Sequence, residues 1–89
     1  MSREILLDSQ ALADIKWWIK ENKKVALKIM ELIETLPNNP FTGKGKPEKL
    51  KFNLSGFWSR RITQEHRLVY EVQDKYIRIV SCRFHYQKY

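Results

Sequence analysis

The chain has 89 residues, of which 43% are hydrophobic, a formal net charge of +7 and a single cysteine, Cys82. This length suits one domain over residues 1–89, and a lone cysteine excludes an intramolecular disulfide. No stretch approaches the roughly 20 apolar residues of a membrane-spanning helix, and the N-terminus lacks the apolar core of a signal peptide. We therefore expect a protein of the reducing cytoplasm that does not use the membrane.

The positive charge is concentrated in the second half of the chain. Residues 1–42 carry six basic and six acidic side chains, whereas residues 43–89 carry eleven basic and four acidic ones. Such a field attracts polyanions and speeds their encounter, while charges that serve solubility alone are normally spread over the surface. The asymmetry therefore indicates nucleic acid or an acidic protein as a partner.

Three elements are expected before Pro37. Ile5-Leu6-Leu7 predicts a short strand, after which Asp8 or Ser9 can cap a helix. Asn22 and the following lysine pair suit the end of that helix or a turn into the next one. Apolar residues at helical spacing predict the buried faces of the two helices, namely Leu12, Ile15, Trp18 and Ile19, then Val25, Ile29, Leu32, Ile33 and Leu36.

A loop rich in proline and glycine, residues 37–47, separates these helices from a region of alternating pattern. Strands are expected at residues 50–54, 57–63, 66–72 and 76–84. Alternation places Arg67 on the outward face and His66 nearer the helices. The sum predicts an α+β fold in which two N-terminal helices pack on a mainly antiparallel, twisted sheet of four to five strands.

Ionisable residues of the strand half are the candidates for chemistry. No phosphate-binding glycine loop, usual zinc site or nucleophile elbow is present, so we expect no metal or other cofactor. RNA supplies its own nucleophile, the 2′-hydroxyl, and needs a base, an acid for the departing 5′-oxygen and a cation for the charged phosphorane. Glu48 as base, His85 as acid and Arg67 as clamp would fill these roles.

Simpler explanations exist for the same residues. Glu48 lies among four lysines, and its spacing alone favours an ordinary surface ion pair, just as His85 alone is more often a solvated terminal residue than a catalyst. The arginines can grip phosphate without catalysis. Other side chains are expected to be structural: His66 in the hairpin, Cys82 as a buried apolar residue, and Trp17 and Trp18 in the core. One of Phe57 and Trp58 alternates outward, where it can stack a base or fill a dimer contact.

A long, ordered series of residues in the second half matches a known pattern. It consists of Pro40-Phe41, Gly43 to Glu48, Leu50-Lys51, Asn53 to Ile62, Glu65 to Tyr70 and Cys82 to Tyr86, with a weaker match at Lys28-Ile29 and Glu31 to Ile33. On these residues the chain closely resembles the YoeB toxins, a family of the RelE/ParE superfamily of bacterial toxin–antitoxin systems. The resemblance implies a compact fold of this kind and an mRNA interferase, a ribosome-dependent endoribonuclease that cuts mRNA in the A site. The products would be a 2′,3′-cyclic phosphate and a 5′-hydroxyl, and translation would stop.

The resemblance also implies roles by position. Glu48 matches the general base, His85 the general acid and Arg67 the transition-state stabiliser. Lys51 and Arg61 match positions that assist at the phosphate, and Tyr86 matches a tyrosine that shapes the site. Further substrate-binding residues are expected among the basic side chains nearby, namely Lys46, Lys49 and Arg60.

The partners implied by the resemblance are mRNA, the 70S ribosome with its 16S rRNA, a YefM-type antitoxin and a second copy of the toxin. The chain departs from the family pattern because it continues beyond the His-Tyr pair as Gln87-Lys88-Tyr89. Two other functions are compatible with the expected fold and the basic residues. One is a toxin of the ParE type that inhibits DNA gyrase, and the other is a basic repressor or RNA-binding module without catalysis.

Overall fold

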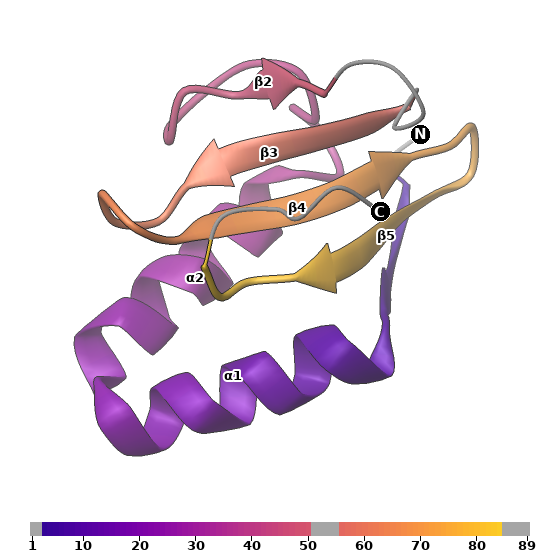
Figure 1. The fold of residues 1–89 in the computed structure, drawn as a ribbon. Helices are drawn as coiled ribbons and strands as arrows, with labels where there is room; N and C mark the ends of the chain where they lie inside the picture. The colour runs from indigo at the N-terminus through magenta and orange to yellow at the C-terminus, as the bar shows by residue number, and fades with distance from the viewer. Residues whose placement is uncertain (1–2, 51–55, 85–89) are drawn as a thin grey trace.

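The computed structural model describes residues 3–50 and 56–84, which form a five-stranded sheet with both helices on one side (Figure 1). The strand order is β1-β5-β4-β3-β2; β1 runs parallel to β5, and the other neighbours are antiparallel. This arrangement confirms the predicted α+β class. The elements are β1 (Glu4–Leu7), α1 (Ser9–Glu21), α2 (Lys23–Thr35), β2 (Glu48–Lys49), β3 (Phe57–Arg61), β4 (Arg67–Val72) and β5 (Tyr76–Ser81).

Asn22 separates the two helices and caps both. Its backbone N–H donates to the carbonyl oxygen of Trp18 at the end of α1, and its side chain accepts from the N–H of Val25 at the start of α2. Asp8 occupies the N-cap position of α1, but its carboxylate makes no cap bond and pairs with Arg78 instead. Each helix has 13 residues, and no helix in residues 3–50 and 56–84 combines the length and apolarity that a bilayer crossing requires.

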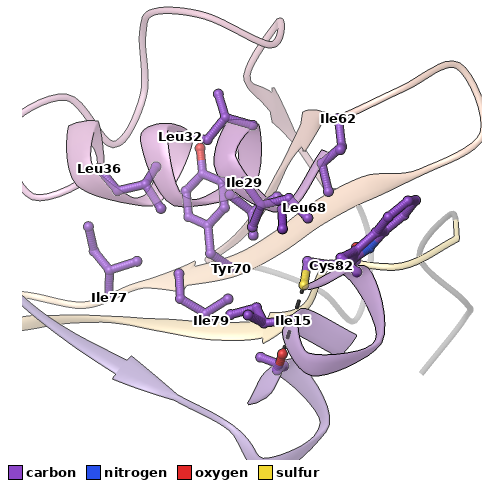
Figure 2. Packing of buried hydrophobic residues seen from close by; sticks show 13 residues of the cluster. Ile15, Ile29, Leu32, Leu36, Ile62, Leu68, Tyr70, Ile77, Ile79 and Cys82 are labelled. Carbon is purple, nitrogen blue, oxygen red and sulfur yellow. Dashed lines mark hydrogen bonds between the residues drawn. The ribbon is translucent and has the colours of Figure 1, made fainter. Parts of the chain in front are cut away.

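One apolar core fills the space between the helices and the sheet (Figure 2). The predicted buried face of α2 is confirmed, because Ile29, Leu32 and Leu36 all lie in this core. The predicted face of α1 is half right. Trp18 and Ile15 are buried, but Leu12 and Ile19 are exposed, because the inward stripe of α1 consists of Ala11, Asp14, Ile15 and Trp18.

β3 ends at Arg61 rather than at residue 63, β4 begins at Arg67 rather than at residue 66, and β5 ends at Ser81 rather than at residue 84. Ile62 belongs to the hairpin turn, where its N–H donates to the carbonyl oxygen of His66. β5 ends at Ser81, and the next three residues leave the ladder. The strand expected at 50–54 has as its described counterpart β2, at Glu48–Lys49, followed by buried Leu50; residues 51–54 lie outside the described residues.

Candidate active site

Cross-strand pairing sorts the predicted site residues between the two faces of the sheet. Glu48 of β2 pairs with Ser59 of β3. Two residues further along β3, Arg61 pairs with Arg67 of β4. Directly paired residues share a face, as do residues two apart along a strand, so Glu48, Arg61 and Arg67 project from one face. We call this the outward face, because the opposite face carries the core residues Leu68 and Tyr70. Strand spacing and rise separate the Cα atoms of Glu48 and Arg67 by about 12 Å.

Arg61 and Arg67 form a like-charged pair directly across two strands. The Arg61 N–H donates to Gly45 and the Arg67 N–H donates to Phe84, so each amide points away from the other strand. This is the closer type of antiparallel pair, with Cα atoms about 4.5 Å apart. Like charges placed opposite one another destabilise a sheet. A pair of cations in this position is suited to share an anion, which would remove the repulsion.

The guanidinium of Arg67 is oriented by the hairpin turn. Its Nη1 lies 2.8 Å from the carbonyl oxygen of Thr63, 3.2 Å from that of Gln64 and 3.0 Å from that of His66. The Nε and Nη2 groups find no hydrogen-bond partner among residues 3–50 and 56–84. The side chain is therefore fixed on one side while retaining donors in the fork geometry that matches phosphate.

Glu48 lies exposed on the two-residue edge strand β2. Within the described part of the chain, both ion pairs belong to Arg78, which contacts Asp8 at 2.5 Å and Glu71 at 2.9 Å. The surface ion pair considered for Glu48 is therefore not among them, and its carboxylate is accessible from the outward face.

Arg60 lies on the helix side of the sheet, and the prediction that it binds substrate is wrong. Its side chain has no exposed surface. Nε donates to the Tyr70 hydroxyl at 3.1 Å, and the terminal nitrogens donate to the carbonyl oxygens of Lys44, Thr42 and Asn39. A guanidinium enclosed in this way cannot reach RNA. Its function in the fold is to hold the loop that joins α2 to β2.

The remaining basic candidates lie around this loop. A cleft of about 930 Å³ opens between α2 and the loop, and its lining includes Lys46 and Arg61 but neither Glu48 nor Arg67. Lys49 is exposed at the edge of the sheet. It pairs with Trp58, which packs against the core, so its side chain leaves the strand on the helix side. The cleft is therefore a neighbour of the outward-face residues rather than their meeting point.

Residues 82–84 connect the sheet to the predicted acid. Side chains of α1 contact Cys82 and Arg83, the His66 ring contacts Phe84, and the Arg67 N–H donates to the Phe84 carbonyl at 2.9 Å. His85, Tyr86 and Lys51 lie outside the described residues. The chain thus reaches the position before His85 directly beside Arg67.

Two structural predictions near the site are confirmed. Cys82 is fully buried, and burial together with the nearby Asp14 carboxylate raises the pKa of its thiol to about 12. His66 lies on the helix side, with its ring 4.8 Å from that of Trp18. Sequence reasoning missed Asp14, although an acid within the apolar stripe of α1 was a visible signal.

The open question about the two aromatic residues of β3 is resolved by the same alternation. Trp58 packs against the core and lies 5.0 Å from the Phe41 ring, so it is the inward residue. Phe57 projects from the outward face, where the guanidinium of Arg78 lies 5.7 Å from its ring centre. Phe57 is therefore partly covered by a cation that is itself paired with two carboxylates.

Comparison with known proteins gives a consistent result. A family model described as the YoeB-like toxin of bacterial type II toxin–antitoxin systems matches residues 7–86. The Escherichia coli protein Toxin YoeB is 51% identical over 83 residues, which cover 93% of this chain and 99% of that protein. The YoeB dimer from Staphylococcus aureus superposes with a TM-score of 0.85 at 47% identity, covering 97% of this chain and 100% of the other. A chain of a YoeB-YefM complex from the same organism superposes with a TM-score of 0.82 at 48% identity, and it covers the same shares of the two chains.

Proposed function

The chain belongs to the YoeB family and is a toxin of a bacterial type II toxin–antitoxin system, and we propose that it acts as a ribosome-dependent endoribonuclease. Its substrate is mRNA in the A site of the 70S ribosome, and cleavage there stops translation. The observation that carries the proposal is the common outward face of Glu48, Arg61 and Arg67.

The reaction transfers a phosphoryl group within the RNA, from the 5′-oxygen of one nucleotide to the 2′-oxygen of the preceding one. Glu48 accepts the proton of the 2′-hydroxyl as the 2′-oxygen attacks the adjacent phosphorus. The bond from phosphorus to the 5′-oxygen breaks, and His85 gives its proton to that oxygen. The products are a 2′,3′-cyclic phosphate and a 5′-hydroxyl. A well-placed acid or base contributes about 10² to 10⁴-fold to such a step.

Arg67 and Arg61 supply the electrostatic part of this mechanism. Negative charge grows on the non-bridging oxygens in the transition state, and preorganised donors aimed at that charge lower the barrier. The hairpin carbonyls orient Arg67 before substrate arrives, and the repulsion between the two arginines is relieved when an anion binds between them. A separation of about 12 Å between the Cα atoms of Glu48 and Arg67 leaves room for one phosphodiester group between the two side chains.

Other residues are proposed in supporting roles. Lys51 assists at the phosphate and Tyr86 shapes the site. Lys46 lines the neighbouring cleft and Lys49 lies on the edge strand, so both add positive charge beside the scissile group. A positive field of this kind favours RNA through release of its counterions.

We further propose a homodimer and a YefM-type antitoxin as protein partners. The support is the likeness to the YoeB dimer and to the YoeB-YefM complex from Staphylococcus aureus, both of which cover nearly the whole chain. The ribosomal partner would be 16S rRNA around the A site, and the working compartment the cytoplasm.

Primer extension on a defined mRNA tests the activity. Purified 70S ribosomes are stalled with an empty A site and mixed with the wild-type chain, with Glu48→Gln, or with Asp74→Asn as a control that also removes one acid. We expect a cut within the A-site codon with wild type and with Asp74→Asn, and only when ribosomes are present. Glu48→Gln should lose the cut.

The chemistry of the ends gives an independent check. The downstream fragment should accept phosphate from polynucleotide kinase without prior phosphatase treatment, because its 5′-end is a hydroxyl. Undiminished cutting by Glu48→Gln would overturn the role of the base. Absence of any cut with wild type would overturn the nuclease and direct attention to DNA gyrase.

A further inference from the structure

Side chains of α1 hold the chain immediately after β5. The N–H of Cys82 donates to Oδ2 of Asp14 at 3.0 Å, and the indole N–H of Trp18 donates to the carbonyl oxygen of Cys82 at 2.8 Å. Asp14 and Trp18 are four residues apart and therefore adjacent on one face of the helix. Both backbone groups of Cys82 are thus satisfied by α1 rather than by a neighbouring strand.

His66 and Arg67, where the chain enters β4, hold Phe84 in the same manner. The N–H of Phe84 donates to Nδ1 of His66 at 2.6 Å, and the N–H of Arg67 donates to the carbonyl oxygen of Phe84 at 2.9 Å. The His66 ring lies between the rings of Trp18 and Phe84, at 4.8 and 5.3 Å. We call the three side chains of Asp14, Trp18 and His66 the clasp.

The clasp holds a conformation that the chain would not adopt by itself. Phe84 has a φ of 62°, which costs a side-chain-bearing residue free energy. The neighbouring guanidinium of Arg83 lies 3.6 Å from the centre of the Trp17 ring, and its buried Nε has no hydrogen-bond partner among the residues that the structure describes. Such features persist only where the surroundings over-determine the geometry, and they gather at functional sites.

The position of the clasp connects it to the proposed reaction. Phe84 is followed by His85, and consecutive Cα atoms lie 3.8 Å apart. The Phe84 carbonyl accepts a hydrogen bond from the Arg67 N–H, so the clasp sets the point from which the chain continues into His85. We infer that Asp14, Trp18 and His66 are positioning residues for the general acid His85, because they fix the point beside Arg67 from which the chain enters it. This inference rests on the proposed function.

Variants that retain an aromatic ring can distinguish a positioning role of the clasp from a packing role. Trp18→Phe removes the donor to Cys82, and His66→Phe removes the acceptor for Phe84, while both retain an aromatic side chain. His66→Asn loses the ring but offers an oxygen near the place of Nδ1. Trp58→Phe makes the same change as Trp18→Phe in a tryptophan outside the clasp and serves as the control.

The experiment measures single-turnover cleavage on 70S ribosomes at saturating and at limiting toxin, well below the melting temperature of each variant. We expect Trp18→Phe and His66→Phe to lower the rate at saturation at least about tenfold, with half-saturating concentrations within about twofold of wild type. His66→Asn should stay within about threefold, although it is the less stable of the two His66 variants. Trp58→Phe should cleave like wild type.

A second substrate identifies the acid as the affected group. A 5′-bridging sulfur in place of the scissile 5′-oxygen leaves without protonation, so it removes the need for an acid. On this substrate His85→Ala, Trp18→Phe and His66→Phe should recover to near the wild-type rate, whereas Glu48→Gln should remain slow. Recovery of this kind does not follow from a loss of stability.

The outcomes distinguish the two levels of the proposal. Wild-type rates for both ring-keeping variants overturn the inference, as does a defect that the sulfur substrate relieves in His85→Ala but not in them. A normal rate for His85→Ala also overturns it, because the clasp is then positioning no acid. Failure of wild type to cut either substrate refutes the nuclease itself, and the inference with it.

Discussion

Arg60 and Arg61 are neighbours on β3, and they project from opposite faces of the sheet. Arg60 is completely buried and donates to three backbone carbonyls and a tyrosine hydroxyl. Arg61 is exposed, lies opposite another arginine and lines an open cleft. The same side chain is thus a structural cation on one face and an anion-binding candidate on the other.

This difference shows that a cation's role follows from its partners rather than from its type. On the helix side, neutral carbonyl and hydroxyl oxygens accept the hydrogen bonds of the buried guanidinium, because a buried polar group without a hydrogen-bond partner is costly. The outward face leaves like charges together and donors without protein partners in the described residues. A surface that tolerates this cost is prepared for a ligand that carries negative charge. Each prediction below alters one face and asks whether the other responds.

The largest effect is expected from Arg67→Ala on the outward face. The rate of A-site cleavage should fall by about 10² to 10³-fold, because the transition-state charge loses an oriented donor. Single-turnover cleavage measures this loss, with Lys75→Ala in the β4–β5 turn as a control of equal charge. If both variants lose activity equally, the outward face contributes only general electrostatic attraction.

A large loss of stability is expected from Arg60→Met on the helix side. Removing the guanidinium leaves buried carbonyls and the Tyr70 hydroxyl without their donor, at about 1–3 kcal/mol for each acceptor left unsatisfied. The free energy of unfolding should therefore fall by about 3 kcal/mol or more. Urea denaturation of Arg60→Met and Arg61→Met measures the contrast. Arg61→Met should stay within about 0.5 kcal/mol of wild type. Equal losses would show that the two arginines do not differ in the way proposed. Arg60→Lys gives a second test, because it keeps the charge but lacks the fork.

The α+β class was predictable because long segments carry clear periodicities. The 3.6-residue pattern of α2 and the alternation of β4 place Ile29, Leu32, Leu68 and Tyr70 in the core, as found. The face of Arg67 followed from the same alternation. These are local rules, and they hold where one side of an element is consistently apolar.

Burial that depends on distant parts of the chain was not predictable in this way. Arg60 was expected to bind substrate, because a sequence does not show that the loop carbonyls of residues 39–44 will surround it. The end of β5 was placed three residues late for a similar reason. Asp14 and Trp18 take the backbone hydrogen bonds of Cys82 that a continued strand would use, and they lie more than 60 residues away in sequence. The meeting of Phe84 with His66 likewise depends on tertiary contacts.

An intermediate effect is expected from Tyr70→Phe. The Tyr70 hydroxyl accepts from Arg60 and donates to the carbonyl oxygen of Pro40 at 2.7 Å, so it joins β4 to the loop. Its loss should lower the free energy of unfolding by about 1–3 kcal/mol. Cleavage should change little, because the hydroxyl lies on the helix side. Tyr76→Phe in β5 is the control, and a Tyr70→Phe variant as stable as its control would contradict this role.

The smallest effect is expected at Cys82 and only in alkali. Burial, with a further contribution from Asp14, raises the pKa of its thiol from 9.0 to about 12. Below pH 9 the thiol is protonated in both states, so it adds no pH dependence. Between pH 9 and 12 the unfolded chain releases the proton and the folded chain keeps it. The free energy of unfolding should therefore fall as the pH rises, by up to about 1.4 kcal/mol per pH unit from this group.

Urea denaturation at pH 8 to 10 should show a steeper fall for wild type than for Cys82→Ala, by roughly 1 kcal/mol in total. Equal slopes would mean that the thiol ionises in the folded chain, and that the helix side is less closed around Cys82 than around Arg60.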